Sequence, residues 1–339
     1  MVALSILDQS PIEQHESVQD GLKRTIELSQ IADELDYTRY FLAEHHNIPE
    51  VVGTSPEILV THLLTKTERI NIGSGGVMLQ HYSPFKVVEQ FHLISQLAPG
   101  RVDLGVGKAP GGFPLATKAL QMELQNPPIA FEEKLHLLNQ FNSNSFLKDN
   151  EFKQLQTANR SDDTPKPNIF LLGGSKSSAE LAAKEQVNFI FAYFINSSKE
   201  ALEEAARIYK QLFPEGIFVV AAAAVVVEND ADKQQVEEGR TNYRVNLAEG
   251  KSLTVNTIEQ VEAFRTQSSE ALTVEEQKID VIHGSKQEVE VELQQLVIEG
   301  YVDELMLHMP VQSHALRVKT VKQLAPSNKI INNTKAGII

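Results

Sequence analysis

The stretch IFVVAAAAVVV, from Ile217 to Val227, is the longest apolar run in the sequence. A helix that crosses a bilayer needs about 20 apolar residues, so this run is too short to span a membrane. It is rich in valine, a β-branched residue that favours strands. An unbroken apolar run of this kind predicts a strand buried on both faces, as in a parallel sheet covered by helices.

Short apolar stretches with helical periodicity between them extend this pattern over most of the chain. Alternation of strands and helices predicts a parallel sheet. Eight such units favour a closed (β/α)8 TIM barrel, the α/β fold that we expect over residues 1–326, with an open sheet as the alternative. The eight predicted strands are Ala3–Leu7, Tyr40–Ala43, Ile70–Val77, Val102–Gly107, Asn168–Leu172, Asn188–Ala192, Phe218–Val227 and Glu304–His308.

Two polar segments interrupt the alternation. Residues 144–167 predict a long loop, and residues 228–285 predict an insertion between strands seven and eight. Within the insertion, weak helical periodicity covers Asp230–Leu247 and Thr257–Phe264. The C-terminal tail, residues 327–339, has no periodicity, and we expect it to be disordered.

The composition restricts the partners and the compartment. The 339 residues carry a formal net charge of −14 and include no cysteine. An acidic surface repels nucleic-acid phosphates and anionic lipids, so we expect neither nucleic acid nor membrane as a partner. The lack of cysteine removes disulfides, thiol nucleophiles and thiolate metal sites, and it fits a cytoplasmic protein. The first residues, MVALSILDQSP, lack the pattern of a signal peptide.

Titratable side chains follow the second predicted strand, where a TIM barrel places its active site. Glu44, His45 and His46 are adjacent there. Histidine exchanges protons near neutral pH, which indicates catalysis. A solvated loop with two chance histidines is the alternative. A metal-dependent hydrolase site with His45 and His46 as ligands is a weaker one, because neighbouring side chains on an extended segment point in opposite directions.

Glycines follow the third, fourth and fifth predicted strands. The segment Gly73–Val77, GSGGV, indicates either a β-bulge or the close approach of a flat ligand or another backbone. A second glycine-rich turn, Gly105–Gly112, contains Lys108. The third, GGSKSS from Gly173 to Ser178, opens a helix, and free backbone N–H groups with hydroxyls at a helix start favour a phosphate. An N-capped helix without a ligand is the alternative.

Four segments together resemble the bacterial luciferase-like flavin monooxygenases. The resemblance runs from Leu4 to about Ala325, and the order and spacing of the motifs make it specific. The segments are RYFLAEHH (Arg39–His46), GSGGVMLQHYSP (Gly73–Pro84), PGRVDLGVG (Pro99–Gly107) and LLGGSKSSAELAAKEQVNFIFAYFIN (Leu171–Asn196).

The resemblance implies a TIM-barrel oxidoreductase, a monooxygenase that uses O2 and reduced FMN from a separate NAD(P)H-dependent reductase to oxidise a small organic substrate. A deazaflavin-dependent enzyme and a non-catalytic flavin-binding protein are the alternatives. His45 is the implied proton-handling catalytic residue, and we expect Glu44 to orient it or to contact the flavin ring; no metal is implied. The implied cofactor-binding residues are Gly75, Gly76, Val77, Lys108, Gly174, Ser175, Ser178, Ala192 and Tyr193.

Three further features are expected. The resemblance implies a non-proline cis peptide between Gly75 and Gly76. For the substrate side we expect a lining of aromatic side chains, Phe113, Tyr193 and Phe194. The resemblance also implies a homodimer formed through helices beside strands two and three, and the helix after strand three has more apolar residues than one barrel-facing stripe requires. These residues are Val87, Val88, Phe91, Leu93, Ile94 and Ala98.

Overall fold

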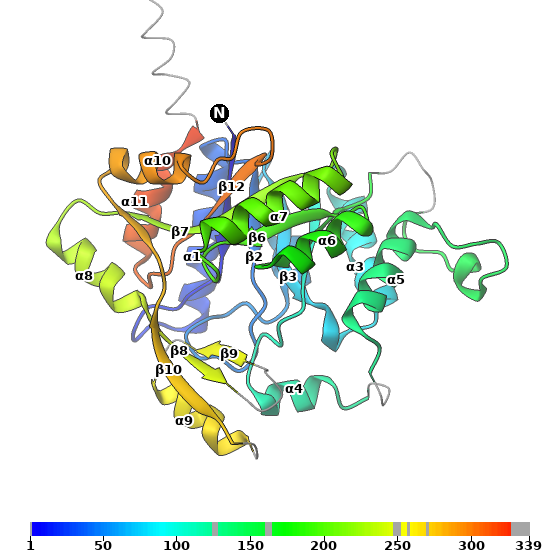
Figure 1. Cartoon of the computed structure of the whole chain (residues 1–339), viewed down its shortest axis with the longest axis horizontal. Helices are drawn as coiled ribbons and strands as arrows, with labels where there is room; N and C mark the ends of the chain where they lie inside the picture. Colours follow the sequence, from blue (N-terminus) through cyan, green and yellow to red (C-terminus); the bar gives the residue numbers. More distant parts are fainter. Residues whose placement is uncertain are drawn as a thin grey trace, which may run out of the picture.

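The protein is a closed barrel of eight parallel strands surrounded by helices, as predicted (Figure 1). The computed structural model describes residues 2–123, 128–159, 165–246, 252–255, 258–268 and 271–326. Pairing of β12 with both β1 and β7, and of β6 with β7, closes the barrel. The barrel strands are β1 (Ala3–Asp8), β2 (Arg39–Leu42), β3 (Asn71–Met78), β4 (Val102–Gly107), β5 (Asn168–Gly173), β6 (Asn188–Ala192), β7 (Phe218–Val226) and β12 (Glu304–His308).

Helices pack their apolar stripes on the outside of the barrel, and one large core cluster lies between strands and helices. Serine caps start several helices; Ser17, for example, forms a capping box with Asp20. The helices around the barrel are α1 (Val18–Glu34), α2 (Pro56–Leu64), α3 (Pro84–Leu97), α5 (Phe131–Ser143), α6 (Lys176–Lys184), α7 (Lys199–Leu212), α10 (Lys286–Gln294) and α11 (His314–Leu324), and the short elements are η1 (Leu79–His81), α4 (Pro114–Leu120) and η2 (Glu151–Gln154).

Most of the apolar surface that led us to expect a dimer lies inside this core. Val87, Val88, Phe91 and Ile94 of α3 are buried within the single chain, because α3 packs against α2, β4 and α5. These four residues therefore provide no surplus apolar surface on α3, contrary to the expectation. On α3 and α2, Leu93, Leu97 and Ile58 remain exposed.

The inside of the barrel is layered. At the amino ends of the strands, the Arg39 guanidinium lies 2.7 Å from Asp103 and 2.9 Å from Glu304. Asn168 donates to Asp103, and Ser5 donates to Glu304. Burial raises the pKa of Glu304, and the nearby Arg39 opposes that rise. An apolar layer follows, and the mouth of the barrel lies above it. The apolar layer contains Leu7, Phe41, Phe170, Ile190, Val219, Ala221 and Met306.

The insertion between β7 and β12 is a small α/β unit, drawn at the lower left of Figure 1. The helix expected over Asp230–Leu247 was wrong beyond Gly239. There the chain alternates polar and apolar residues, and Val245 is buried between partly or fully exposed neighbours, as in a strand. The unit comprises α8 (Asp230–Gly239), an antiparallel sheet of β8 (Thr241–Asn246), β9 (Ser252–Val255) and β10 (Thr273–Lys278), the helix α9 (Ile258–Gln267), and β11 (Ile282–Gly284) beside β7.

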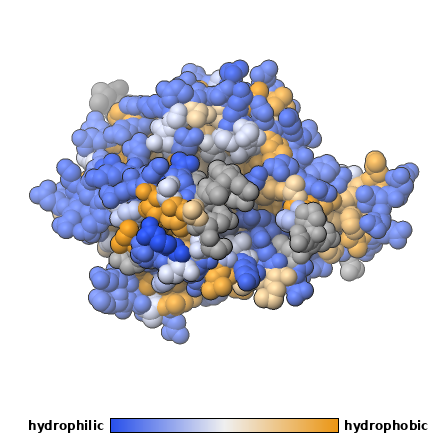
Figure 2. Space-filling view, turned by 60° about the horizontal axis from the view of Figure 1, so that its bottom comes forward, coloured by the Kyte–Doolittle hydropathy of each residue, from blue (hydrophilic) through white to orange (hydrophobic). Residues whose placement is uncertain are grey.

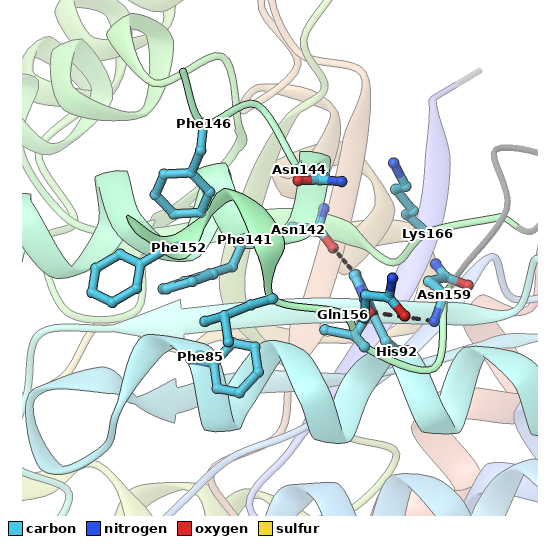
Figure 3. Close-up of a pocket in the computed structure, with 12 residues that line it drawn as sticks. Phe85, His92, Phe141, Asn142, Asn144, Phe146, Phe152, Gln156, Asn159 and Lys166 are labelled. Carbon is cyan, nitrogen blue, oxygen red and sulfur yellow. Dashed lines mark hydrogen bonds between the residues drawn. The ribbon is translucent and has the colours of Figure 1, made fainter. Parts of the chain in front are cut away.

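The segment after α5 forms an excursion with an aromatic interior. Phe141 packs against Phe146, with ring centroids 4.8 Å apart, and against Phe152 at 5.6 Å. Phe85, Phe141 and these neighbours line a small cavity of about 160 Å³ (Figure 3). Figure 2 shows a mainly hydrophilic surface, with apolar residues on the protrusion at the right; Leu147, Phe152 and Leu155 are exposed in this segment.

The predicted tail, residues 327–339, lies outside the described residues. None of the helices that the structure describes is both long enough and apolar enough to span a bilayer.

Candidate active site

Strand β3 carries a bulge at the mouth of the barrel. Its register against β4 shifts between Ser74 and Val77, and the peptide bond between Gly75 and Gly76 is cis, which confirms that prediction. A Cβ on Gly76 would lie 2.8 Å from the backbone of Gly105, and one on Gly75 would lie 2.6 Å from Leu7. The glycines therefore accommodate neighbouring strands, so a valine at position 76 would disturb β4 as well as any ligand.

Two predicted cofactor contacts have side chains that point away from the mouth. Val77 and Tyr193 are buried in the cluster between barrel and helices, so a ligand at the mouth would meet only their backbone. Phe113, predicted on the substrate side, is instead packed in the core of the insertion against Phe264. Ala192 follows the inward-facing Ile190 by two residues, which places Ala192 on the inner face of β6.

Glu44 is buried and serves as a junction between three segments. One carboxylate oxygen accepts from the Tyr82 hydroxyl at 2.7 Å and lies 2.6 Å from Nε2 of His46. The other accepts from the backbone N–H of Met78 at 3.1 Å. Both oxygens are thus used to hold the ends of β2 and β3, and the orienting role toward His45 that we expected for Glu44 has no hydrogen bond to support it.

His45 lies three residues beyond the end of β2, with its backbone hydrogen-bonded and its ring without a partner at Nδ1 in the described part of the chain. Its backbone N–H donates to Gly53 at 2.7 Å. Its Nδ1 is buried and has no hydrogen-bond partner among the residues that the structure describes. Burial lowers the pKa of His45 to about 4, and the neighbouring His46 acts in the same direction. The ring is therefore neutral at neutral pH, and its Nδ1 is free to form a hydrogen bond with a ligand.

The turn between β5 and α6 presents hydroxyls at a helix start. Ser175 caps α6 by accepting from the backbone of Ser178, and its hydroxyl lies 3.0 Å from those of Ser177 and Ser178. Residues in the first turn of a helix have N–H groups without intrahelical partners. A Cβ on Gly174 would meet nothing closer than 3.5 Å, so the backbone there is open. Hydroxyls, helix dipole and open backbone are chemically suited to a phosphate.

Lys108 is exposed and already has a partner. Its Nζ lies 3.0 Å from Glu132 and 5.8 Å from the centre of the Phe131 ring. An ion pair this exposed contributes at most about 1 kcal/mol, so little energy opposes its opening. The described structure does not place the Lys108 side chain at the Gly174–Ser178 turn, and that role stays a prediction.

His308 is a mouth residue that the sequence did not single out. It ends β12, two residues beyond Met306 of the inner apolar layer and four beyond Glu304 of the polar layer, so alternation directs its ring inward. Its ring centroid is 4.9 Å from that of Phe194, which follows β6. The inward register of Glu304, Met306 and His308 is the sequence signal that would have found it.

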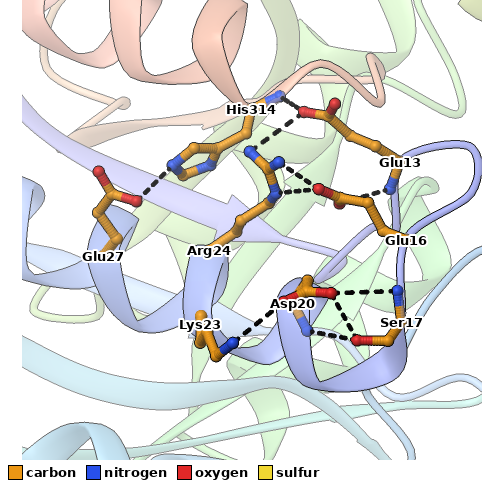
Figure 4. A network of polar contacts seen from close by, with 8 residues as sticks. All are labelled: Glu13, Glu16, Ser17, Asp20, Lys23, Arg24, Glu27 and His314. Atoms are coloured by element: carbon orange, nitrogen blue, oxygen red, sulfur yellow. Dashed lines mark hydrogen bonds and ion pairs between the residues drawn. The ribbon is translucent and has the colours of Figure 1, made fainter.

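A charged network fixes the loops on this side of the mouth (Figure 4). Glu13, in the loop after β1, accepts from the backbone N–H of His314 at 2.6 Å, at the start of α11. Arg24 of α1 pairs with Glu13 at 3.3 Å and also with Glu16, and Glu27 lies 3.0 Å from the His314 ring. The segment that follows His308 is therefore anchored to α1.

Comparison with known proteins identifies the family. The family model described as luciferase-like monooxygenase matches residues 2–324. The chain belongs to the luciferase-like monooxygenase family. It is therefore an oxidoreductase of that family with a TIM-barrel fold, as the sequence predicted.

Relatives within this family match over nearly the full chain. The N-acetyl-S-alkylcysteine monooxygenase of Bacillus subtilis (strain 168) is 42% identical over 316 residues, which cover 92% of this chain and 94% of that protein. The luciferase-like monooxygenase of Escherichia coli (strain K12) is 27% identical over 328 residues, 94% of each chain. The crystal structure of apo-MsnO8 matches with a TM-score of 0.75 and 25% identity, over 97% of this chain and 99% of that one.

The geometry does not favour a metal site at His45 and His46. Within the described ranges, no three His, Asp or Glu side chains meet in an arrangement that could hold a metal ion. His46, one of the two proposed ligands, has its Nε2 engaged with Glu44.

Proposed function

We propose that this protein is a monooxygenase that uses reduced FMN and O2 to oxidise a small organic thioether of the N-acetyl-S-alkylcysteine class. The observation that carries the proposal is His45: a neutral imidazole with an unpaired Nδ1, as far as the described residues go, at the mouth of a luciferase-like barrel. The substrate class comes from the relative that is 42% identical over most of the chain.

The residues present fit a flavin phosphate. The Gly174–Ser178 turn and the N-terminus of α6 would hold it, with Lys108 turning from Glu132 to neutralise charge. The flavin ring would lie against the backbone of Gly75, Gly76 and Val77. It would also face Ala192 on the inner face of β6 and the backbone of the next residue, Tyr193. When bound, reduced FMN supplies the electrons that activate O2. A separate NAD(P)H-dependent reductase would deliver it in that form; a deazaflavin is the alternative cofactor.

The chain's own residues would then bind, orient and manage protons. His45 would accept or return a proton at Nδ1, because this nitrogen has no competing partner among the described residues and the ring is neutral. Glu44 would keep the ends of β2 and β3 in place rather than act on the substrate. We also propose a cytoplasmic homodimer, in which the exposed Ile58, Leu93 and Leu97 lie at the subunit contact.

The test is isotopic. The full-length protein, FMN, an NADH-dependent flavin reductase and N-acetyl-S-methylcysteine are incubated under isotopically labelled O2, and products are analysed by mass spectrometry. Incorporation of one labelled oxygen atom into the thioether, dependent on the protein, supports the proposal. FMN binding without oxidation above the free-flavin background would instead indicate a flavin-binding protein that does not catalyse this reaction.

A further inference from the structure

A second imidazole at the mouth of the barrel has an unused nitrogen. Nδ1 of His308 is fully buried and makes no hydrogen bond to any described residue. Buried polar atoms in native proteins nearly always have partners, and those without one call for an explanation such as a ligand or an ordered water. The proposed catalytic role of His45 does not involve His308.

The surroundings of His308 show which neighbours are already occupied. Asp8 and Arg317 lie close by, but Asp8 accepts from Arg317, from the Tyr40 hydroxyl and from the backbone of Ser10. The charge of each is thus satisfied without the imidazole. His308 stands in register with Leu7 of β1 and Ala223 of β7, whose side chains are apolar. The backbone of Leu7 interacts with the His308 ring and opposes the fall in its pKa, but Nδ1 remains without a partner among the described residues.

Phe194 completes this corner of the mouth. It follows β6 and its backbone N–H donates to Ala221 of β7 at 3.1 Å, which carries it across β7 toward β12. Its ring is partly exposed and tilted by 52° against the His308 ring. The His308 imidazole and the Phe194 ring thus lie side by side in this wall of the mouth. The imidazole offers a polar atom, Nδ1, and the phenyl ring offers an apolar face.

We infer that His308 is a positioning residue for the substrate: Nδ1 hydrogen-bonds a polar group of the bound molecule, while Phe194 packs on its apolar part. This rests on the proposed function, and it adds a second polar anchor to the mouth that holds His45; β12 is separated from β2, the strand that His45 follows, by β1 alone. The ligand class is a small molecule with an alkyl portion and an uncharged hydrogen-bonding group, such as an amide.

The preference for an uncharged group follows from the environment. Burial lowers the pKa of His308 to about 4, and His45 contributes to that fall, so the two rings lie near enough to influence each other. A neutral imidazole offers one hydrogen bond at Nδ1 rather than a charge, which suits an amide or hydroxyl. The N-acetyl amide of N-acetyl-S-methylcysteine is such a group.

His92 provides a matched control. It too is a buried histidine, but both ring nitrogens are engaged, Nδ1 with Thr157 at 2.6 Å and Nε2 with Asn142 at 2.9 Å (Figure 3). It lies on α3, beside the cavity under the excursion and away from the carboxyl ends of the strands. A structural histidine and one kept for a ligand should respond in opposite ways to an apolar replacement.

The experiment compares His308→Leu, His308→Gln and His92→Leu in the full-length protein. Thermal unfolding is measured without substrate, and KM and kcat for N-acetyl-S-methylcysteine are measured with reduced FMN. We expect His308→Leu to keep or raise Tm, because an unpaired buried nitrogen is removed, and to raise KM about tenfold with a smaller change in kcat. We expect His308→Gln to recover most of the KM loss.

His92→Leu should do the reverse: a Tm lowered by about 2–6 °C, because Asn142 and Thr157 lose a partner, with KM unchanged. A fall in Tm for His308→Leu as large as that for His92→Leu would overturn the inference, and so would an unchanged KM. The Tm comparison needs no substrate. Wild-type protein that does not oxidise the thioether would therefore count against the proposed function, while the Tm pair still decides whether His308 is structural.

Discussion

The carboxylate of Glu44 lies 2.6 Å from Nε2 of His46, two residues along the chain, and not beside the ring of its immediate neighbour His45. The three residues of the EHH motif therefore divide into a structural pair and one free imidazole. Glu44 and His46 connect β2 to β3, since Glu44 also accepts from Met78 and Tyr82. His45 is left with an unpaired Nδ1 among the described residues.

This division predicts opposite phenotypes for two adjacent residues. His45→Ala should lower turnover by about 10²–10⁴-fold, as for loss of a general acid or base, with little change in FMN affinity. Glu44→Gln should mainly lower the free energy of unfolding, by about 1–3 kcal/mol, because three hydrogen bonds to a carboxylate are weakened. Steady-state kinetics and urea unfolding check both. A stable, inactive Glu44→Gln variant would return Glu44 to the catalytic group.

Lys108 should distinguish FMN from riboflavin. Lys108→Ala should weaken FMN binding by about 1.5–3 kcal/mol, the usual value for a hydrogen bond to a charged group, and leave riboflavin binding nearly unchanged. Glu132→Gln is the matched control, because it frees Lys108 from its present partner and should not weaken FMN binding. Flavin fluorescence titration gives the affinities. Equal losses for both flavins would mean that Lys108 does not touch the phosphate.

Acid should destabilise the protein in a defined window. The pKa values of His45 and His308 are lowered to about 4 by burial, so between about pH 6.5 and 4 the unfolded chain binds more protons than the folded one. The free energy of unfolding should be constant with respect to these groups above about pH 6.5, and should fall as the pH decreases toward 4. Urea unfolding across this range measures it. The His308→Leu variant should show a shallower slope, and an unchanged slope would contradict the assignment.

Removing the buried cation at the base of the barrel should be costly. Arg39→Met leaves Asp103 and Glu304 without their shared partner, and breaking a buried ion pair from one side typically costs about 3–5 kcal/mol. Arg265→Met, at an exposed pair with Glu262, is the control and should cost less than about 1 kcal/mol. Chemical denaturation of both variants tests the difference, and equal losses would argue against a buried ionic layer.

The exposed leucines of α3 test the dimer. If Leu93 and Leu97 lie at the subunit contact, replacing both with glutamate should yield a folded monomer, because charges would be buried in an apolar contact. Light scattering at micromolar concentration reports the mass, and circular dichroism reports the fold. Wild-type protein that is already monomeric would remove the proposal.

The barrel strands were predictable because each is a short apolar run bounded by helical periodicity, and these are local properties. The sheet of the insertion was not, since β8 and β10 are mainly polar and only Val245 and a few other residues face a core. Partnerships across the barrel were also hidden. Arg39 and Glu304 are 265 positions apart and meet only when β12 closes against β1. The residues of the sequence motifs could be recognised one by one, but their hydrogen-bond partners depend on strands that meet only in the closed barrel.

Phe113 belongs to the segment between β4 and α4, yet it completes the apolar core of the insertion with Val245, Val255, Val261 and Phe264. Hydrogen bonds also connect the insertion to the barrel loops: the backbone N–H of Leu115 donates to Gln267 of α9 at 3.3 Å, and Gln260 of the same helix donates to Glu50 at 2.9 Å. The insertion therefore does not have a complete hydrophobic core of its own. A chimera that exchanges the insertion between two relatives would have to exchange the β4–α4 segment as well. Otherwise the core of the transferred insertion would lack its matching residue at position 113.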